Sequence, residues 1–473
     1  MSFIGRQKDL ILFEEDYQSK RSELVILYGR RRIGKSTLLE KFAQGKSCFF
    51  FQAGKEKKQK QLKRFISEFS QVLGNPPLIA KLRLTEWNEA LLMLEQNLEI
   101  LMKTKRGTKA IIIFDEFQWM CEGAPELLSD LQRYWDKSWK KRGDLFLILC
   151  GSSMSFMVGE VLSKKSPLFG RRTRSIHLNS LELDDVQKFF PHRSPHEIFE
   201  TYASVGGVPK YLEVLQASHS LHRGLVKEAF SKNGYFFKET GFVLGEQLKE
   251  TEHYYQMLAE LSKQPLELIE LEKTTHIGSG QLFYYIEKIQ RLGFVDRLAP
   301  FGSKKTTRKV RYQLKDYFLR FYFSFIAPCH RQLMRQQSHS SFQEIVENRW
   351  DSFMGRAFES VCYDHADFIA RATGFDQVKD IGTYWQKPTQ RKKGVQIDLI
   401  IECDDHTLLL CECKWSRQPC GLEAIKELKN RVELFPNPKQ QTIIPTLISA
   451  SGFTQEVQKE SSIKKVDLRA LLT

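Results

Sequence analysis

The 473-residue sequence lacks the features that mark secreted, zinc-binding and membrane-spanning proteins. It contains no Cys-x-x-Cys pair and no array of cysteine and histidine with zinc-ligand spacing. Its longest apolar runs, such as 110–114, have the length of a strand, whereas a membrane-spanning helix needs roughly 18 residues. No long apolar core follows Met1, so no signal peptide is expected. We therefore expect a cytoplasmic protein with no membrane partner.

Acidic residues are outnumbered by basic ones. The 57 Asp and Glu stand against 72 Lys and Arg, which gives a formal net charge of +15. This balance favours a polyanionic partner such as DNA, and the alternative is a lysine-rich surface that is only solvated. The nine cysteines lie mostly in apolar, strand-like surroundings, which indicates reduced, buried thiols. The length predicts two or three domains, each with its own core.

The clearest motif is Gly-x-x-x-x-Gly-Lys-Ser at 29–36, which follows an apolar strand and precedes a helical pattern. This order is that of a P-loop, whose glycines turn backbone N–H groups toward phosphate oxygens. Lys35 is expected to reach the β- and γ-phosphates of ATP, and Ser36 is expected to ligate Mg²⁺. The predicted nucleotide-binding residues of this loop are Gly29, Arg30, Arg31, Arg32, Ile33, Gly34, Lys35, Ser36 and Thr37.

Two further apolar strands end in polar residues. The strand at 110–114 is followed by Asp115 and Glu116. Because ligands of doubly wound sheets bind at the carboxyl ends of strands, we expect Asp115 to hold Mg²⁺ through water. Glu116 is expected to orient and deprotonate the attacking water. The strand at 144–150 ends near Ser152, which would sense the γ-phosphate or cap the next helix.

Two neighbouring arginines, Arg171 and Arg172, follow in a turn. The planar, always ionised guanidinium suits the charge that develops during phosphoryl transfer. A surface pair that binds local acids is the alternative. Farther on, Gly-Gly-Val-Pro at 206–209 predicts a tight bend, which either closes over the nucleotide base or is a simple corner.

Together these stretches resemble the prokaryotic AAA+/STAND-type ATPases of the archaeal ATPase family, over about residues 1–330. The resemblance implies ATP and Mg²⁺, a sensor at Ser152, an arginine from the 171–172 pair, and Pro209 near adenine. Such arginines can act on the ATP of a neighbouring subunit, so the resemblance leaves a homo-oligomer open. The matching stretches are 3–6, 29–36, 111–118, 131–136, 151–153, 167–173 and 206–209.

Residues 252–326 predict a different unit. Helical patterns at about 254–263, 266–274 and 279–292 precede a strand pair joined by a basic turn, which together indicate a winged helix. A basic wing can contact DNA phosphates, and the alternatives are an ATPase lid or a protein-binding module. The cations of the turn are Lys304, Lys305, Arg308 and Lys309.

The C-terminal part begins after an aromatic segment at 317–329, which we interpret as a helix packed between domains. The polar stretch 331–341 is expected to be a linker. Beyond it, a strand carrying Asp398 is followed by a strand that places Glu412 and Lys414 on one face. Two acids and a lysine are the minimum set of a metal-dependent phosphodiesterase, in which Asp398 and Glu412 hold Mg²⁺.

This arrangement resembles the PD-(D/E)xK nuclease superfamily over residues 342–473. The resemblance implies that Glu359, on the preceding helix, is a third acid of the catalytic set. One position departs from the pattern, because many members carry an acid where this chain has Gln396. A nuclease-like fold that is kept without activity is the alternative.

We therefore predict an α/β protein. A P-loop NTPase domain with a doubly wound parallel sheet occupies 1–215, a helical lid and winged helix 216–330, and an α/β nuclease-like domain 342–473. The protein would bind and hydrolyse ATP with Mg²⁺ and link this cycle to DNA binding or processing. The alternative is a STAND-like signalling or scaffold ATPase whose C-terminal domain binds a partner and is inactive.

Overall fold

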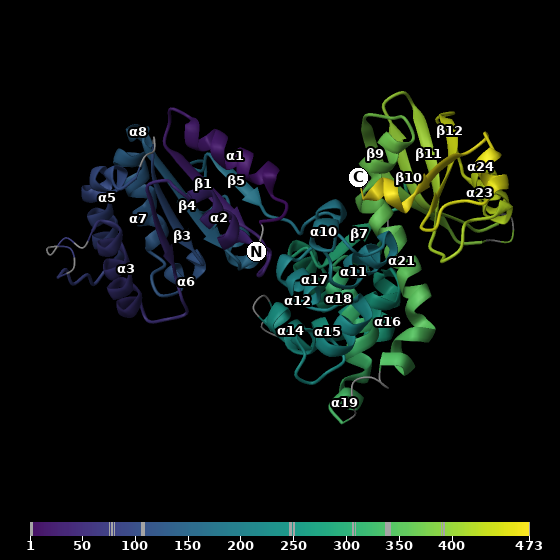
Figure 1. The fold of residues 1–473 in the computed structure, drawn as a ribbon, viewed down its shortest axis with the longest axis horizontal. Helices are drawn as coiled ribbons and strands as arrows, with labels where there is room; N and C mark the ends of the chain where they lie inside the picture. The colour runs from purple at the N-terminus through teal and green to yellow at the C-terminus, as the bar shows by residue number, and fades with distance from the viewer. Residues whose placement is uncertain are drawn as a thin grey trace. The chain divides into compact units, whose positions relative to one another are not determined.

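The computed structural model describes residues 3–74, 76, 79, 81–105, 109–245, 248, 251–304, 307, 309–335, 342–388, 390 and 393–472. The chain forms two compact units (Figure 1). The first unit contains residues 1–180 and Val208–Lys210, and the second contains Leu181–Gly207 and Tyr211–Thr473. No helix among the described residues is long and apolar enough to cross a membrane.

The first unit is built on a five-stranded parallel sheet with the order β2-β3-β4-β1-β5. Its central strands are buried throughout, as expected for a parallel sheet that is covered on both faces. The order places β4 between β1 and β3, so the carboxyl ends of these three strands are neighbours. The strands are β1 (Glu23–Tyr28), β2 (Cys48–Gln52), β3 (Ala110–Asp115), β4 (Leu145–Gly151) and β5 (Arg174–His177).

Alternate residues of the strands contribute to two separate hydrophobic cores, because successive side chains of a strand point to opposite faces of the sheet. Leu24 and Ile26 belong to one core, and Val25 and Leu27 belong to the other. Helices α1 (Gln7–Gln18) and α2 (Lys35–Ala43) supply the second of these cores. The helices on the opposite face are α3 (Lys58–Val72), α5 (Trp87–Lys103), α6 (Phe117–Glu122) and α7 (Leu127–Tyr134). Short helices α8 (Lys140–Arg142) and α9 (Met154–Phe156) flank β4.

The second unit starts with a helical part. Its first helices are α10 (Leu183–Phe189), α11 (Pro195–Val205), α12 (Pro209–Gln216), α13 (Leu221–Glu228) and α14 (Tyr235–Gly245). Residues 181–207, which we expected within the ATPase domain, therefore lie in the second compact unit. The bend at 206–209 depends on glycine, because a Cβ on Gly207 would lie 1.8 Å from the carbonyl oxygen of Leu181.

Three helices and a three-stranded antiparallel sheet follow, with the sheet order β6-β8-β7. The helices lie where the sequence pattern predicts them, apart from a short strand before the second helix. Of the predicted basic turn, Lys305 and Arg308 lie outside the described residues, and both Lys304 and Lys309 are exposed. The elements are α15 (Thr251–Lys263), β6 (Leu266–Glu267), α16 (Leu268–Thr275), α17 (Ser279–Arg291), β7 (Val295–Leu298) and β8 (Arg311–Leu314).

The aromatic segment at 317–329 is a packed helix, as the sequence indicates. It begins as α18 (Tyr317–Phe321), and its Phe325 lies 5.0 Å from the Phe353 ring of α21 (Asn348–Asp364). Of the predicted linker, residues 331–333 belong to α19 (His330–Leu333), and 336–341 lie outside the described residues.

A second five-stranded sheet completes the chain, with the order β13-β12-β11-β10-β9. The pairs β9–β10 and β10–β11 are antiparallel, whereas β11–β12 and β12–β13 are parallel. All nine cysteines of the chain are free thiols, and seven of them are buried. The strands are β9 (Val378–Gln386), β10 (Val395–Cys403), β11 (Thr407–Lys414), β12 (Thr442–Ser449) and β13 (Lys464–Asp467), and the helices are α22 (Ala366–Ala372), α23 (Leu422–Leu434) and α24 (Gln455–Lys459).

Candidate functional site

The loop between β1 and α2 has the backbone of a phosphate cradle. A Cβ on Gly29 would lie 2.5 Å from the carbonyl oxygen of Leu178, so a larger residue does not fit there. Gly34 has φ 91°, in the left-handed region that favours glycine, and it directly precedes α2. The N-terminus of α2 therefore faces the loop, where free N–H groups and the helix dipole attract anions. The Ile33 side chain is buried in the α1–α2 core and anchors the loop.

Lys35 points into this loop. Its side chain is 5% exposed, and its Nζ donates to the carbonyl oxygens of Gly29 at 2.8 Å and Arg30 at 2.9 Å. The charge is therefore held at the centre of the loop, where phosphate oxygens would be bound. The other predicted side chains differ in exposure: Arg31 and Thr37 are exposed, whereas Arg30 and Arg32 are half-buried.

A hydroxyl and a carboxylate meet beside the loop. Ser36 Oγ donates to Asp115 Oδ2 over 2.6 Å, although the two residues are far apart in sequence. Asp115 is fully buried and also accepts from the backbone N–H of Glu116 at 2.9 Å and from Gln52 Nε2 at 3.4 Å. Oxygen donors of these two kinds are what Mg²⁺ prefers, so the residues fit the ion that the sequence predicts.

Glu116 lies at the end of β3 in an unusual conformation. Its φ of 53° is in the left-handed region, which non-glycine residues adopt mainly at constrained sites. Ser152 Oγ donates to Glu116 Oε2 over 2.8 Å. Gln118 Nε2 donates to the same carboxylate oxygen and to Ser152 Oγ, the latter over 3.2 Å. The strand order thus brings Glu116 and Ser152 together, and Gln118 is a third member that the sequence analysis did not single out.

Two segments from outside the strand–loop–helix unit contact the P-loop. Arg6 donates to the carbonyl oxygen of Ile33 at 3.1 Å and to that of Asn179 at 2.5 Å. The Cγ of Pro209 would be 3.7 Å from a Cβ on Gly34. One residue of each predicted stretch, Arg6 of 3–6 and Pro209 of 206–209, is therefore adjacent to the loop.

The two arginines of the predicted pair have different partners. Arg171 forms an ion pair with Asp136 at 2.8 Å, and it also donates to the carbonyl oxygens of Pro167 and Phe169. Arg172 makes a weaker contact with the Leu162 carbonyl oxygen at 3.4 Å. Burial raises the pKa of Tyr28, the last residue of β1, and the charge of Arg172 opposes this rise. The charge of Arg172 is thus close enough to act on β1, the strand that precedes the P-loop.

The predicted residues of the last domain gather beside β10 and β11, two inner strands of the second large sheet. Asp398 Oδ2 accepts from the backbone N–H of Cys413 at 3.1 Å, which ties β10 to β11. Lys414 Nζ lies 2.9 Å from Glu412 Oε1 and 2.7 Å from Glu427. Burial, together with the charges of Asp398 and Glu412, raises the pKa of Glu359 to about 8. All four predicted residues are therefore neighbours.

An arginine that the sequence analysis missed lies among these carboxylates. Arg431, on α23, has its NH1 2.5 Å from Glu412 Oε2 and 3.6 Å from Asp398 Oδ1, and it donates to the Gln396 carbonyl oxygen at 3.2 Å. No group of three or more His, Cys, Asp or Glu among the described residues is placed to hold a metal ion. In this arrangement Arg431 and Lys414 supply the positive charge. No local motif marks Arg431, because it reaches the site from a separate helix.

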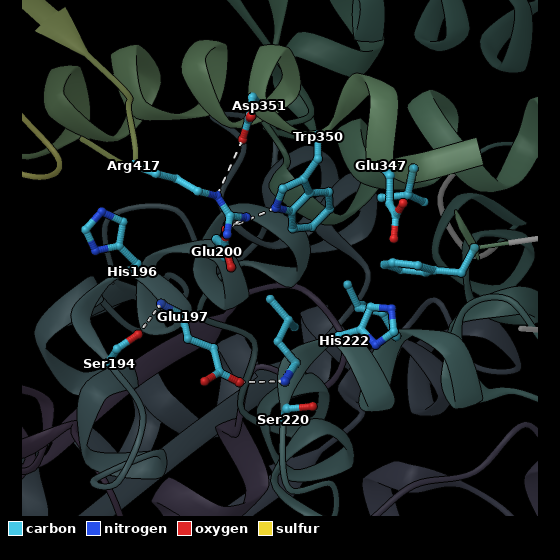
Figure 2. Close-up of a pocket in the computed structure, with 14 residues that line it drawn as sticks. Ser194, His196, Glu197, Glu200, Ser220, His222, Glu347, Trp350, Asp351 and Arg417 are labelled. Atoms are coloured by element: carbon cyan, nitrogen blue, oxygen red, sulfur yellow. Dashed lines mark hydrogen bonds and ion pairs between the residues drawn. The ribbon is translucent and has the colours of Figure 1, made fainter. Parts of the chain in front are cut away.

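A cavity of about 750 Å³ lies in another part of the second unit, away from the carboxylate cluster (Figure 2). Trp350 Nε1 donates to Glu200 Oε1 at 3.0 Å, and Arg417 lies 3.7 Å from Glu200 and 4.0 Å from Asp351. None of the predicted site residues lines this cavity. It is a separate feature from the carboxylate cluster.

Comparison with known proteins supports the first half of this description. Residues 3–215 match a family model described as an ATPase domain predominantly from Archaea. Residues 322–429 match a second family, described as archaeal and bacterial proteins of unknown function. The N-terminal part is thus an ATP-binding domain of the ATPase class, with an α/β fold and a parallel sheet.

Individual relatives agree with the family matches. An uncharacterized protein of Methanocaldococcus jannaschii is 27% identical over 434 residues, covering 91% of this chain and 89% of the relative. An uncharacterized ATP-binding protein of the same organism is 41% identical over 44 residues, which are 9% of this chain and 75% of that protein. Among solved structures, a Walker-type ATPase of Pyrococcus abyssi is 18% identical with a TM-score of 0.50, covering 68% of this chain and 96% of that chain.

Proposed function

We propose that this protein is a Mg²⁺-dependent ATPase that links ATP hydrolysis to the binding or processing of DNA. The observation that carries the ATPase proposal is the meeting of Ser36 and Asp115, 2.6 Å apart, beside the P-loop lysine. The ion that these residues would hold supplies positive charge, which stabilises the phosphate charge during transfer. Ser36 would ligate the ion directly, and Asp115 would hold it through water.

The neighbouring residues have distinct proposed roles. Glu116 accepts the proton of the attacking water, and Ser152 and Gln118 hold its carboxylate in place. Arg172 is the better candidate for the arginine that stabilises transferred phosphate, because Arg171 is already bound by Asp136. Pro209 packs beside the loop on the side where the base would lie.

A purified-protein assay tests the ATPase proposal. The parent protein should hydrolyse ATP with Mg²⁺ and stop when EDTA is added. Asp115→Asn should lose most of this activity, because the amide is a poor ligand for a hydrated cation. Asp130→Asn is the matched control, since Asp130 lies on α7 outside the site and pairs with Arg133. Hydrolysis that is unchanged in Asp115→Asn would contradict the assignment.

The proposal of a DNA partner rests on charge and on the small three-stranded sheet. The net charge is +15, and the turn between β7 and β8 carries exposed Lys304 and Lys309. Helices α15–α17 with this sheet have the element order of a winged helix. We propose that the turn contacts phosphates, because paired cations on a projecting turn fit a polyanion.

A second proposed activity is metal-dependent phosphodiester cleavage by the C-terminal domain. The observation that favours it is the convergence of Glu359, Asp398, Glu412 and Lys414 beside the inner strands β10 and β11. The ion pair of Arg431 with Glu412 favours the alternative of an inactive, partner-binding domain. Cleavage of DNA or RNA that vanishes in Glu412→Ala but survives in Lys35→Ala would locate a nuclease here. No cleavage and no calorimetric metal binding would leave a binding domain.

A further inference from the structure

The carboxylate cluster opens into a cleft that two different sheets build. One cavity, of about 90 Å³, is lined by Glu359 and Asp398, and a second, of about 390 Å³, is lined by Lys387 and Arg431. Both cavities share three lining residues, which are Arg311, Trp385 and Gln396. They are therefore parts of one cleft, which we call the β8–β10 cleft. Strand β8 of the small sheet contributes Arg311, so the candidate active site is not made by the last domain alone.

The side chains of Arg311 and Trp385 are in contact where the two cavities meet. The guanidinium carbon of Arg311 lies 4.7 Å from the centroid of the Trp385 ring, which is a stacked cation–π pair. Both side chains are half-buried rather than covered. Unpaired bases stack on aromatic rings and on arginine guanidinium planes, which are the two surfaces that this pair offers.

Cations line the same cleft close to the carboxylates. Lys387 is held by Glu267 at 3.2 Å and by Glu270 at 3.4 Å, and Arg431 is held by Glu412. These ion pairs fix the two positive groups on the wall of the larger cavity. A phosphate that enters the cleft would be attracted by Arg311, Lys387 and Arg431 together, because charge-assisted hydrogen bonds to phosphate are strong.

The volume of the β8–β10 cleft limits which part of a nucleic acid can enter it. About 390 Å³ is near the lower end of small-ligand pockets and admits one nucleotide. A base of an intact double helix cannot enter such a cavity, because it is paired and stacked inside the duplex. The smaller cavity at Glu359 and Asp398 has no room for a base. A strand can therefore reach the carboxylates through this cleft only where a nucleotide is unpaired.

We propose that the β8–β10 cleft binds a single unpaired nucleotide of a nucleic-acid strand, with its base against the Trp385–Arg311 pair and its phosphate toward Lys387 and Arg431, beside the carboxylate cluster. The preferred substrate is thus a single strand or a frayed end, not an intact duplex. This inference rests on the proposed C-terminal activity for its purpose, but the binding itself does not require cleavage. Trp385 and Arg311 are substrate-positioning residues, one from each sheet.

Binding is measured with the full-length protein in EDTA, where metal-dependent cleavage cannot occur. The probes are a fluorescein-labelled single-stranded DNA of mixed sequence and its blunt duplex, followed by fluorescence anisotropy. Trp385→Ala and Arg311→Ala should each weaken single-strand binding by about tenfold or more and leave duplex binding within about twofold. Trp385→Phe keeps an aromatic face and should retain most of the affinity, which separates lost stacking from lost folding.

A matched control is available on the same small sheet. Arg297 on β7 pairs with Tyr312, whereas Arg311 pairs with Leu298, so the exposed Arg297 lies on the opposite face of the sheet. Arg297→Ala removes the same charge and should leave the single-strand preference unchanged. Equal losses in Arg297→Ala and Arg311→Ala, or equal losses for single strand and duplex, would overturn the proposal.

The proposal for the β8–β10 cleft and the proposal of cleavage activity are contradicted by different results. If the parent cleaves nucleic acid and Trp385→Ala binds single strands as the parent does, the cleft proposal is wrong and the activity remains. If Trp385→Ala loses single-strand binding but no metal supports cleavage, the cleft is a binding site and the nuclease proposal is wrong. Intrinsic tryptophan fluorescence adds a direct readout, because quenching by single-stranded DNA should shrink in Trp385→Phe.

Discussion

Lys35 is the residue on which nucleotide binding should depend most. Its Nζ is held by two loop carbonyl oxygens, and Lys35→Ala removes a charge that is already in position for the phosphates. We expect nucleotide affinity to fall by about tenfold to a hundredfold, because charge-assisted hydrogen bonds are worth about 1.5–3 kcal/mol. Isothermal titration with ATP measures this. Lys41→Ala, on the exposed side of α2, is the control, and an unchanged affinity of Lys35→Ala would rule out the assignment.

Glu116→Gln should separate binding from turnover. The amide keeps the size of the side chain but cannot accept a proton from water, so ATP should still bind while the rate falls by about 10²–10⁴-fold. The comparison is between nucleotide affinity and steady-state hydrolysis of the same preparation. Glu122→Gln, at the exposed end of α6, serves as the control. Hydrolysis at the parent rate would mean that another group is the base.

Glu359 makes the stability of the second unit depend on pH. Its pKa is raised to about 8 from 4.5, first by burial and then by the charges of Asp398 and Glu412. Between these values the folded protein keeps a proton that the unfolded chain has lost, so the contribution of Glu359 to stability is fully present below about pH 4.5 and is lost as the pH rises through about 8.

In EDTA we expect a loss on the order of 1–3 kcal/mol across that range, measured by denaturant unfolding at several pH values. Glu359→Gln cannot ionise and should lose less stability on going to high pH. Glu433→Gln, exposed on α23, should behave as the parent does. Parallel pH profiles for the parent and Glu359→Gln would show that Glu359 has an ordinary pKa in the folded protein.

Functional residues were predictable from the sequence where they stand at fixed positions within one short motif. Lys35 and Ser36 stand beside each other after a glycine, so their pattern is visible without a fold. Gln118 and Arg431 were not predictable, because their roles depend on which side chains the fold brings near them. Gln118 acts through a strand order that places Ser152 beside Glu116, and Arg431 arrives from α23.

At the scale of elements, hydrophobic pattern and charge carried most of the information. The helical pattern at about 279–292 and the apolar strand at 110–114 lie where the structure has α17 (Ser279–Arg291) and β3 (Ala110–Asp115), because each pattern has clear ends. Strand β6, of two residues, was missed since it is too short to show a period. The partition of residues 181–207 into the second unit depends on tertiary packing, which the sequence does not display.

The turn between β7 and β8 should bind phosphates as an element. Changing Lys304, Lys305, Arg308 and Lys309 to alanine should weaken duplex DNA binding, and each lost phosphate contact should lower the slope of log K against log salt by about 0.9. Titrations at several salt concentrations measure the slope. A protein with Lys426, Lys459, Lys464 and Arg469 changed to alanine, all exposed on the last domain, loses the same four charges and controls for net charge. An unchanged slope would show that the turn does not contact DNA.

At the scale of the whole molecule, an ATP-binding unit is joined to a unit with a basic turn and a carboxylate cleft. We propose that these parts work together, so that nucleic acid bound by the second unit changes the rate of ATP hydrolysis in the first. A signalling or scaffold ATPase with the same fold would show no such link. The rate of ATP hydrolysis, measured with and without nucleic acid, therefore distinguishes the DNA-linked ATPase from a signalling or scaffold ATPase.

The most direct test is the steady-state ATPase rate of the full-length protein with Mg²⁺, alone and with saturating single- or double-stranded DNA. We predict a rate that rises by about fivefold or more with DNA, since a coupling of about 1 kcal/mol, at the low end of the usual range between sites, corresponds to about fivefold. The stimulated rate should vanish in Glu116→Gln. A rate that is the same with and without either form of DNA would contradict the central claim.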